Sequence, residues 1–200
     1  MVQTVFIVDD EEPIRDALEM LIMSVGLQVK SFDSAINFLD EYDSTKKGCL
    51  ILDIRMPMMS GLELQDELIK RNSSLPIIFI SGHGDIPMAV NAVKKGAQDF
   101  IAKPFKDQEL LDCVQRALRE NEQVQVKLSA RQEILDRIAS LSEREKQVMD
   151  LMVEGIANKV IAVDLAISQR TVEVHRAKVM EKMYAASLAQ LVKMVASLDT

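Results

Sequence analysis

Acidic, basic and hydroxyl side chains follow four apolar segments of this 200-residue chain. The stretch "FIVDDEE" places Asp9 and Asp10 directly after apolar residues, and "LILDIRMP" does the same for Asp53. Ser81 follows "PIIFI", and Lys103 follows "DFIA". An aspartate can attack phosphorus, while a lysine and a serine can stabilise phosphoryl oxygens by charge and by a hydrogen bond. These residue types therefore indicate phosphoryl transfer.

The three carboxylates also indicate a metal ion. If Asp9, Asp10 and Asp53 are held close together, they repel one another and need a cation. A site of oxygen ligands with few protein groups suits Mg²⁺, which keeps several of its waters. For any one of these residues a solvated surface carboxylate is the ordinary alternative. Their occurrence at successive strand ends favours the magnesium site.

Hydrophobic periodicity predicts the elements that position these residues. Short β-rich runs alternate with helical patterns over the first 120 residues, which is typical of an α/β fold with a parallel sheet covered on both faces. The predicted strands are Thr4–Val8, Gln28–Phe32, Cys49–Leu52, Ile77–Ile80 and Asp99–Ala102. The predicted helices are Ile14–Val25, Ala35–Tyr42, Leu62–Ile69, Ile86–Lys95 and a last one from Gln108 onward. In a doubly wound, flavodoxin-like sheet of order 2-1-3-4-5 the first and third strands are neighbours, so their carboxylates meet in one crevice.

A second, smaller all-α domain follows. The stretch Arg119–Gln132 contains neither proline nor glycine, which predicts a helical linker. "SERE", Ser142 to Glu145, is a capping box that opens a helix, and Gly155 ends that helix. We therefore expect an α/β domain over residues 1–122, a linker over 123–140 and a helical domain over 141–200.

The spacing of the last helices is that of a helix-turn-helix. In "AVDLAISQRTVEVHR" a turn falls at Ala166 and Ile167, and Ser168 is the N-cap of the second helix. One face of that helix is predicted to be buried, with Val172, His175, Val179 and Met183. The opposite stripe carries Arg170, Glu173, Val174, Ala177, Lys178 and Glu181. Periodicity alone leaves open whether this stripe binds a partner or is ordinary solvated surface.

Charge and cysteine content bound the cellular setting. Residues 1–122 hold 13 lysines and arginines against 21 aspartates and glutamates, whereas residues 141–200 hold eight of each, so the two domains are expected to have different partners. Cys49 and Cys113 are too few for a disulfide framework and lie among aliphatic residues. The sequence shows no signal-peptide pattern and no apolar run long enough for a membrane span. The expected location is the cytoplasm, away from membranes.

Residues 1 to about 122 resemble the receiver domain of bacterial two-component response regulators, because all four strand-end motifs match. These motifs are the acidic pair, "LDIRMP", "SGHGD" and "KPF". The resemblance implies that Asp53 is the phosphoacceptor, and that Asp10, Asp53 and the main-chain carbonyl of Arg55 bind Mg²⁺ with Asp9 nearby. It also implies that Ser81 and Lys103 contact the phosphoryl group, that Phe100 moves with Ser81, that the peptide before Pro104 is cis, and that Arg55 and His83 set the phosphate lifetime.

The stretch "LSEREKQVMDLMVEGIANKVIAVDLAISQRTVEVHRAKVMEKM" resembles the DNA-binding domain of the LuxR type. Together the two domains resemble response regulators of the NarL/FixJ class, nearest the FixJ branch. This resemblance implies that Arg170, Glu173, Val174 and Ala177 face base edges in the major groove, where a carboxylate such as Glu173 would accept from cytosine. It implies phosphate contacts from Lys159, Ser168, Thr171 and Lys178, with Arg176 and Lys182 on the flanks.

The implied function is a two-component response regulator that activates transcription and turns over no substrate besides its own phosphate. Its implied partners are a sensor histidine kinase, promoter DNA, RNA polymerase and, once phosphorylated, a second copy of the chain. The receivers are expected to pair through residues 86–95 and 99–102, and the last helices through Leu188, Leu191, Val192 and Val195.

Two other function classes stay open at this point. An aspartate-nucleophile phosphohydrolase would need a general acid two residues after Asp53, where Arg55 stands. A phosphorylated adaptor would use the helical domain to bind only protein.

Overall fold

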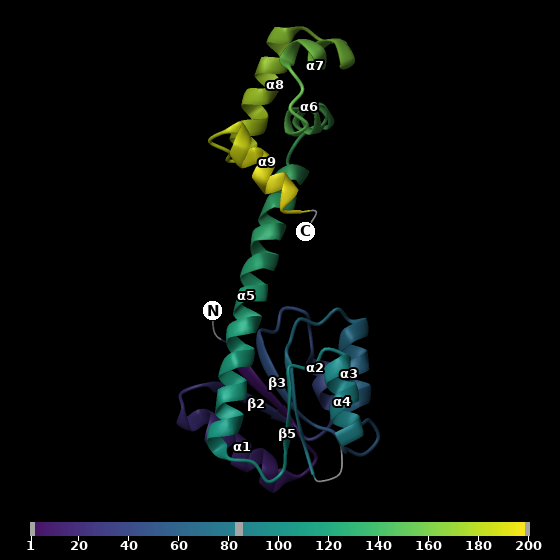
Figure 1. Cartoon of the computed structure of the whole chain (residues 1–200), viewed down its shortest axis with the longest axis vertical. Coiled ribbons are helices and arrows are strands. Elements are labelled where there is room, and N and C mark those ends of the chain that lie inside the picture. Colours follow the sequence, from purple (N-terminus) through teal and green to yellow (C-terminus); the bar gives the residue numbers. More distant parts are fainter. Residues whose placement is uncertain (1–2, 83–85, 199–200) are drawn as a thin grey trace. The chain divides into compact units, whose positions relative to one another are not determined.

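The computed structural model describes residues 3–82 and 86–198 and divides the chain into two compact units, Met1–Gln125 and Val126–Thr200 (Figure 1). The first unit is built on a parallel sheet of order β2-β1-β3-β4-β5. This confirms the predicted doubly wound fold and its strand order. The strands are β1 (Thr4–Val8), β2 (Gln28–Phe32), β3 (Gly48–Asp53), β4 (Ile77–Ser81) and β5 (Asp99–Ala102).

Helices cover both faces of the sheet (Figure 1). They are α1 (Glu12–Ser24), α2 (Ala35–Glu41), α3 (Gly61–Lys70), α4 (Ile86–Lys94) and α5 (Asp107–Ala139). Pro13 stands in the first turn of α1, where its missing N–H costs no hydrogen bond. Gly96 has φ +94 just beyond α4, as expected for a residue that closes a helix in the left-handed conformation.

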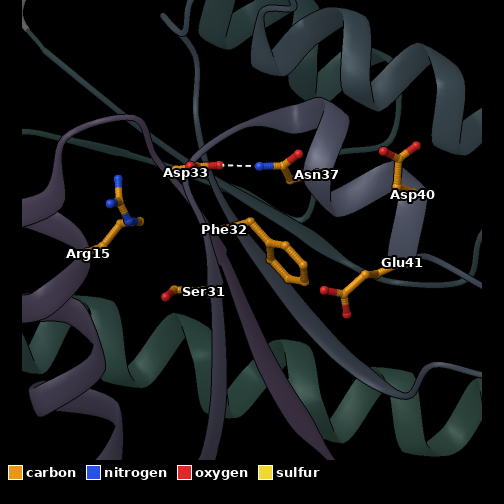
Figure 2. Close-up of a pocket in the computed structure, with 7 residues that line it drawn as sticks. All are labelled: Arg15, Ser31, Phe32, Asp33, Asn37, Asp40 and Glu41. Atoms are coloured by element: carbon orange, nitrogen blue, oxygen red, sulfur yellow. Dashed lines mark hydrogen bonds between the residues drawn. The ribbon is translucent and has the colours of Figure 1, made fainter.

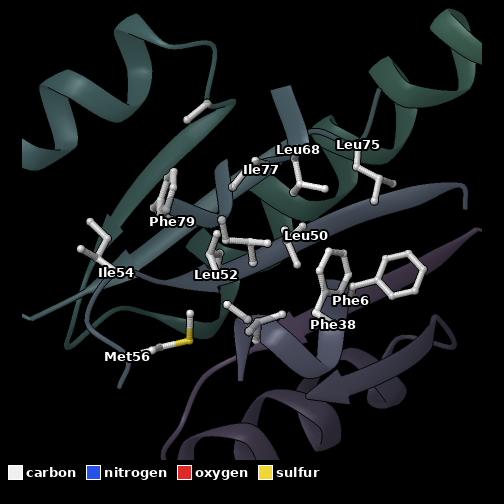
Figure 3. Packing of buried hydrophobic residues seen from close by; sticks show 14 of the residues in the cluster. Phe6, Phe38, Leu50, Leu52, Ile54, Met56, Leu68, Leu75, Ile77 and Phe79 are labelled. Atoms are coloured by element: carbon white, nitrogen blue, oxygen red, sulfur yellow. The ribbon is translucent and has the colours of Figure 1, made fainter. Parts of the chain in front are cut away.

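Alternate residues of each central strand enter opposite cores. In β1, Phe6 and Val8 pack toward α2 and α3, whereas Val5 and Ile7 pack toward α1 and α5. Figure 3 shows the first of these cores, where Phe38 lies edge-on to Phe6 with ring centroids 5.9 Å apart. All six residues of β3 and all five of β4 are buried, so both strands are fixed on each face. The side chains at their carboxyl ends therefore start from a rigid frame.

The second unit is a small helical domain that also includes the end of α5. Its own helices are α6 (Glu143–Val153), α7 (Asn158–Asp164), α8 (Gln169–Lys182) and α9 (Leu188–Ala196). The capping box predicted at Ser142 is present. Ser168 caps α8, accepting a hydrogen bond from the Thr171 N–H at 3.0 Å. Ala166 turns the chain between α7 and α8 with φ +52.

The core of this domain uses three residues in ways that the sequence did not anticipate. Ile134 and Ile138 of α5 pack against it, although they lie in the predicted linker. Leu191, which we expected on a pairing surface of α9, is fully buried in the domain's own core, so that expectation is wrong for this residue. Among the helices of the described ranges, 3–82 and 86–198, none is both long enough and apolar enough to cross a membrane.

Candidate functional site

Two carboxylates and one amine meet at the carboxyl edge of the sheet. Because β1 lies beside β3, with Val8 paired to Leu52, the next residues of the two strands are neighbours. Asp9 is fully buried and Asp53 is 6% exposed. The Lys103 Nζ lies 2.9 Å from Asp9 Oδ2 and 2.7 Å from Asp53 Oδ1. One ammonium group thus bridges both carboxylates.

Main-chain donors fix the other oxygen of each carboxylate. The Glu11 N–H donates to Asp9 Oδ1 at 2.9 Å, and the Arg55 N–H donates to Asp53 Oδ2 at 2.6 Å. The Arg15 guanidinium donates to the main-chain carbonyl of Asp9 at 2.7 Å, which fixes the backbone of the acidic loop. Both carboxylates are therefore oriented before any ligand arrives.

Burial and charge act in opposite directions on these groups. Burial raises the pKa of Asp53 above its ordinary value, and the Asp9 charge adds to that, whereas Lys103 and the Arg55 N–H lower it. For Lys103, burial lowers the pKa, but the hydrogen bonds and charges of Asp53 and Asp9 outweigh that effect and the pKa is raised. The amine stays protonated at neutral pH, so one positive charge lies between two acidic side chains.

The donor chemistry of this edge fits a hard divalent cation, although the predicted three-carboxylate cluster does not form. In the described residues no group of three or more His, Cys, Asp or Glu side chains is placed to hold a metal ion. Asp10 is exposed and lines a hollow of about 400 Å³ together with Asp33 and Met58. Asp9 and Asp53 supply carboxylate oxygens with excess negative charge, and Mg²⁺ needs only one or two carboxylates when it keeps its waters.

The hydroxyl and the switch residues lie on the next two strands. Ser81, at the end of β4, is 1% exposed, and its main-chain oxygen accepts from the Lys103 N–H at 2.6 Å. The Lys103–Pro104 peptide is cis, as the resemblance implied. Phe100 is half-buried and packs against the core on the α2–α4 side. His83 lies outside the described residues.

Two residues that position this site were missed by sequence reasoning. The Arg15 side chain extends from α1 back to Asp9. The only sequence signal for this contact was its position six residues after Asp9. Gly61 begins α3, where its N–H donates to the Ile54 carbonyl at 3.0 Å. A Cβ at Gly61 would lie 2.2 Å from the main-chain oxygen of Asp53, so only glycine allows this close approach.

A polar hollow of about 470 Å³ opens beside the acidic loop, between α1 and α2. Figure 2 shows the Arg15 guanidinium on one side of it and Asp40 and Glu41 on the other. Asn37 donates to Asp33 Oδ1 at 2.6 Å, and this hydrogen bond, with that from Ser34, lowers the pKa of the Asp33 carboxyl. The surroundings of the acidic pair are therefore strongly negative.

In the second unit, the exposed face of α8 borders a shallow hollow. Val172 and Val179 are fully buried beneath it. The outer face forms a hollow of about 590 Å³, lined by Gln169, Arg170, Glu173, Val174 and Ala177. All four residues predicted to face bases thus line one exposed surface. Among the predicted phosphate contacts, the exposed residues are Lys159, Ser168 and Lys178, and the half-buried ones are Thr171 and Arg176.

Lys182, predicted on the flank of the DNA, makes hydrogen bonds within its own domain. Its Nζ donates to Glu145 Oε2 at 2.6 Å and to the Ser140 carbonyl at 3.2 Å. Glu145 is 4% exposed and belongs to the capping box of α6. His175, predicted on the buried face of α8, is half-buried.

Transcriptional response regulators combine a parallel α/β unit with a helix-turn-helix domain. This chain has both, with two aspartates and a lysine at the carboxyl edge of its sheet. The family model "Response regulator receiver domain" matches residues 5–115, and "Bacterial regulatory proteins, luxR family" matches residues 139–195. The chain belongs to this family of receiver-containing response regulators. It is a transcriptional response regulator, and proteins named FixJ are among its similar relatives, in agreement with the resemblance seen in its sequence.

Similar proteins share this two-domain arrangement over nearly their full length. The transcriptional regulatory protein FixJ of Azorhizobium caulinodans is 47% identical over 95% of this chain and 90% of its own. The response regulator protein TodT of Pseudomonas putida is 46% identical over 94% and 83%. Among solved structures, the response regulator StyR is 43% identical, with a TM-score of 0.91 over 98% of this chain and 99% of that chain. Full-length FixJ from B. japonicum is 42% identical, with a TM-score of 0.61 over 98% and 97%.

Proposed function

We propose that a sensor histidine kinase phosphorylates Asp53 and that the modified receiver controls DNA binding by the second domain. The observation that carries this proposal is the position of Lys103, whose Nζ lies within 2.9 Å of both Asp9 and Asp53. A receiver domain implies a kinase partner, and a LuxR-family domain implies DNA. The phosphohydrolase and adaptor alternatives are not favoured, because the relatives over nearly the whole chain are response regulators.

The chemistry follows from the oriented carboxylate. Asp53 Oδ1 attacks the phosphorus, the bond from phosphorus to the donor nitrogen breaks with its electrons moving to that nitrogen, and an acyl phosphate forms. Mg²⁺, which receiver domains generally bind at this position, would supply positive charge beside the phosphoryl oxygens when bound. We propose Asp10, Asp53 and the Arg55 carbonyl as its ligands with Asp9 nearby, which requires the exposed Asp10 side chain to turn toward Asp53. Lys103 can transfer its charge from the carboxylate to the phosphoryl oxygens, and the Ser81 hydroxyl can donate to them.

The output depends on a surface formed by the fourth helix and the fifth strand. When Ser81 moves toward the phosphoryl group, half-buried Phe100 turns inward and the surface over α4 changes. Val90 and Val93 on α4 are 49% and 51% exposed, and two such faces can pair around a two-fold axis. We assign the receiver to residues 1–122, a helical linker to 123–140 and the DNA-binding domain to 141–200.

The second domain gains from pairing because its own charge is balanced. With eight basic and eight acidic residues it makes few phosphate contacts and binds weakly as a monomer. Two linked copies on adjacent half-sites bind more tightly through effective concentration. Arg170, Glu173, Val174 and Ala177 read base edges, while phosphate contacts come from Lys159, Ser168, Thr171 and Lys178, with Arg176 on the flank. RNA polymerase is the downstream partner, and the cytoplasm is the location because promoter DNA lies there.

Direct labelling tests the phosphoacceptor. The full chain is incubated with Mg²⁺ and acetyl phosphate, and the intact mass is measured for wild type, Asp53→Asn and the control Asp40→Asn. Asp40 is an exposed acid of the same domain, outside the Lys103 site. Wild type and Asp40→Asn should each gain one phosphoryl group, and Asp53→Asn should gain none. A phosphoryl group on Asp53→Asn would refute the assignment.

A further inference from the structure

The first turn of α6 contacts the end of α7 and the end of α8. Arg144 Nη2 donates to the main-chain oxygen of Leu165, which is the C-cap of α7 just before the turn. One residue later, Glu145 Oε2 accepts from the Nζ of Lys182, the last residue of α8, at 2.6 Å. The same ammonium group donates at 3.2 Å to the carbonyl of Ser140, in the short connection between α5 and α6. Two adjacent residues of α6 therefore form hydrogen bonds with the chain on either side of α8. Arg144 bonds just before the turn that precedes α8, and Glu145 bonds the last residue of α8.

Apolar side chains fix which face of α8 points inward. Val172 and Val179 are buried, Met180 packs against the same core while partly exposed, and Met183 adds a contact just beyond the end of the helix. The angle of the helix about this face also depends on contacts at its ends. A shift of the outer stripe by an ångström or so would carry Arg170 and Glu173 away from hydrogen-bonding distance. Polar contacts at the two ends restrict that movement.

Glu145 is suited to this task because it is already fixed. Its carboxylate accepts from the Ser142 N–H at 2.8 Å within the capping box, and it is 4% exposed. The hydrogen bond from Lys182 is the main cause that lowers the pKa of the Glu145 carboxyl to about 2, so this carboxyl is ionised at every physiological pH. The Lys182 side chain is 37% exposed and bonded toward the domain interior.

We propose that Arg144 and the Lys182–Glu145 pair are positioning residues that set the angle at which α8 enters the major groove. They act through the helix and make no contact with DNA themselves. The proposal rests on the proposed function of α8 as the base-reading helix. It replaces the sequence-based expectation that Lys182 binds a flanking phosphate.

The experiment separates positioning from phosphate contact by charge. Binding of the full chain, activated with beryllofluoride and Mg²⁺, is measured by fluorescence anisotropy on its selected site and on a scrambled duplex, across a range of salt concentrations. Lys182→Met should lower affinity for the selected site about tenfold, the loss expected when one base contact falls out of reach, and leave the scrambled duplex and the salt slope unchanged. The control Lys178→Met removes an exposed cation of the same helix and should weaken binding to both duplexes and reduce the salt slope by about 0.9 for each bound protomer.

Glu145→Gln gives the opposite prediction under the two accounts. It breaks the pair yet removes a negative charge, so a domain that uses Lys182 on phosphate should bind both duplexes more tightly. A positioning role predicts about tenfold weaker binding to the selected site and no gain on the scrambled duplex. Lys182→Arg keeps the ion pair and should therefore show the selectivity of wild type. It provides a folded variant for comparison if Lys182→Met unfolds.

Each outcome decides a different claim. If Lys182→Met behaves like Lys178→Met, or if Glu145→Gln binds both duplexes more tightly, the positioning role is overturned. Unchanged selectivity in Lys182→Met and Arg144→Met also overturns it. If wild type itself does not prefer the selected site, the proposed DNA-reading function fails instead.

Discussion

Gly61→Ala tests how closely the phosphoacceptor depends on the backbone around it. The added Cβ would lie 2.2 Å from the Asp53 carbonyl oxygen and 3.0 Å from Leu52 Cγ. Ordinary contact needs a separation near 3.4 Å, so either α3 or the end of β3 must move by roughly 1 Å. Neither is free to yield, because the Gly61 N–H is bonded to Ile54 at 3.0 Å and β3 is buried along its whole length.

The expected losses follow from that displacement. Forcing extra volume into a packed position costs about 1–3 kcal/mol in the free energy of unfolding. A misplacement of about 1 Å at a reacting group costs on the order of 100-fold in rate. We expect phosphorylation of Gly61→Ala by acetyl phosphate to be slower than wild type by about 10- to 100-fold, with the variant still folded.

The assay is the time course of acyl-phosphate formation, followed by intact mass, alongside a thermal melt by circular dichroism. Gly82→Ala is the matched control, since it lies just after β4 at the same edge and a Cβ there meets no atom of the described residues within 4 Å. That variant should react and melt like wild type. If Gly61→Ala is phosphorylated at the wild-type rate, the claim that this backbone contact sets the position of Asp53 is wrong.

Three further predictions concern the second domain and the pairing surface. Glu173→Ala should relax the preference at one base pair of a selected DNA site, measured by sequencing bound DNA; a uniform loss at every position would contradict a base-reading role. Because the folded pKa of Glu145 is about 2 against an ordinary 4.5, its ionised form stabilises the domain fully above about pH 4.5, and this stability is lost as the pH falls toward 2. Melts at successive pH values should therefore show less acid destabilisation in Glu145→Gln than in wild type, and equal slopes would disprove the linkage. Val93→Glu should keep the activated protein monomeric in ultracentrifugation while phosphorylation continues; a full dimer fraction would place the interface elsewhere.

The strands and their order were predictable from sequence because buried parallel strands read as continuous apolar runs. Residues such as "CLILD" and "IIFIS" have no polar member before the strand end, and the structure moves the predicted boundaries by only one residue. Helix starts at Ser142 and Ser168 were equally clear, since each has a capping side chain. Local patterns of this kind are decided within a few residues.

The site was predictable only where strand ends determine it. Asp9, Asp53 and Lys103 meet because β1 and β3 are neighbours, but the exposure of Asp10 depends on a loop conformation that periodicity does not describe. Arg15 and Lys182 have long side chains whose contacts lie 6 and 37 residues away in sequence. Which cation turns inward and which faces solvent depends on the packed tertiary structure.

The central claim, that phosphate on Asp53 controls DNA binding, is tested most directly by one affinity measurement. The dissociation constant for a selected DNA site is measured for wild type and Asp53→Asn, each with and without acetyl phosphate and Mg²⁺, with the dimer fraction recorded in the same samples. Wild type should bind at least about tenfold more tightly when phosphorylated and should dimerise, whereas Asp53→Asn should not change. Equal tightening in both proteins, or none in a fully phosphorylated wild type, would contradict the account.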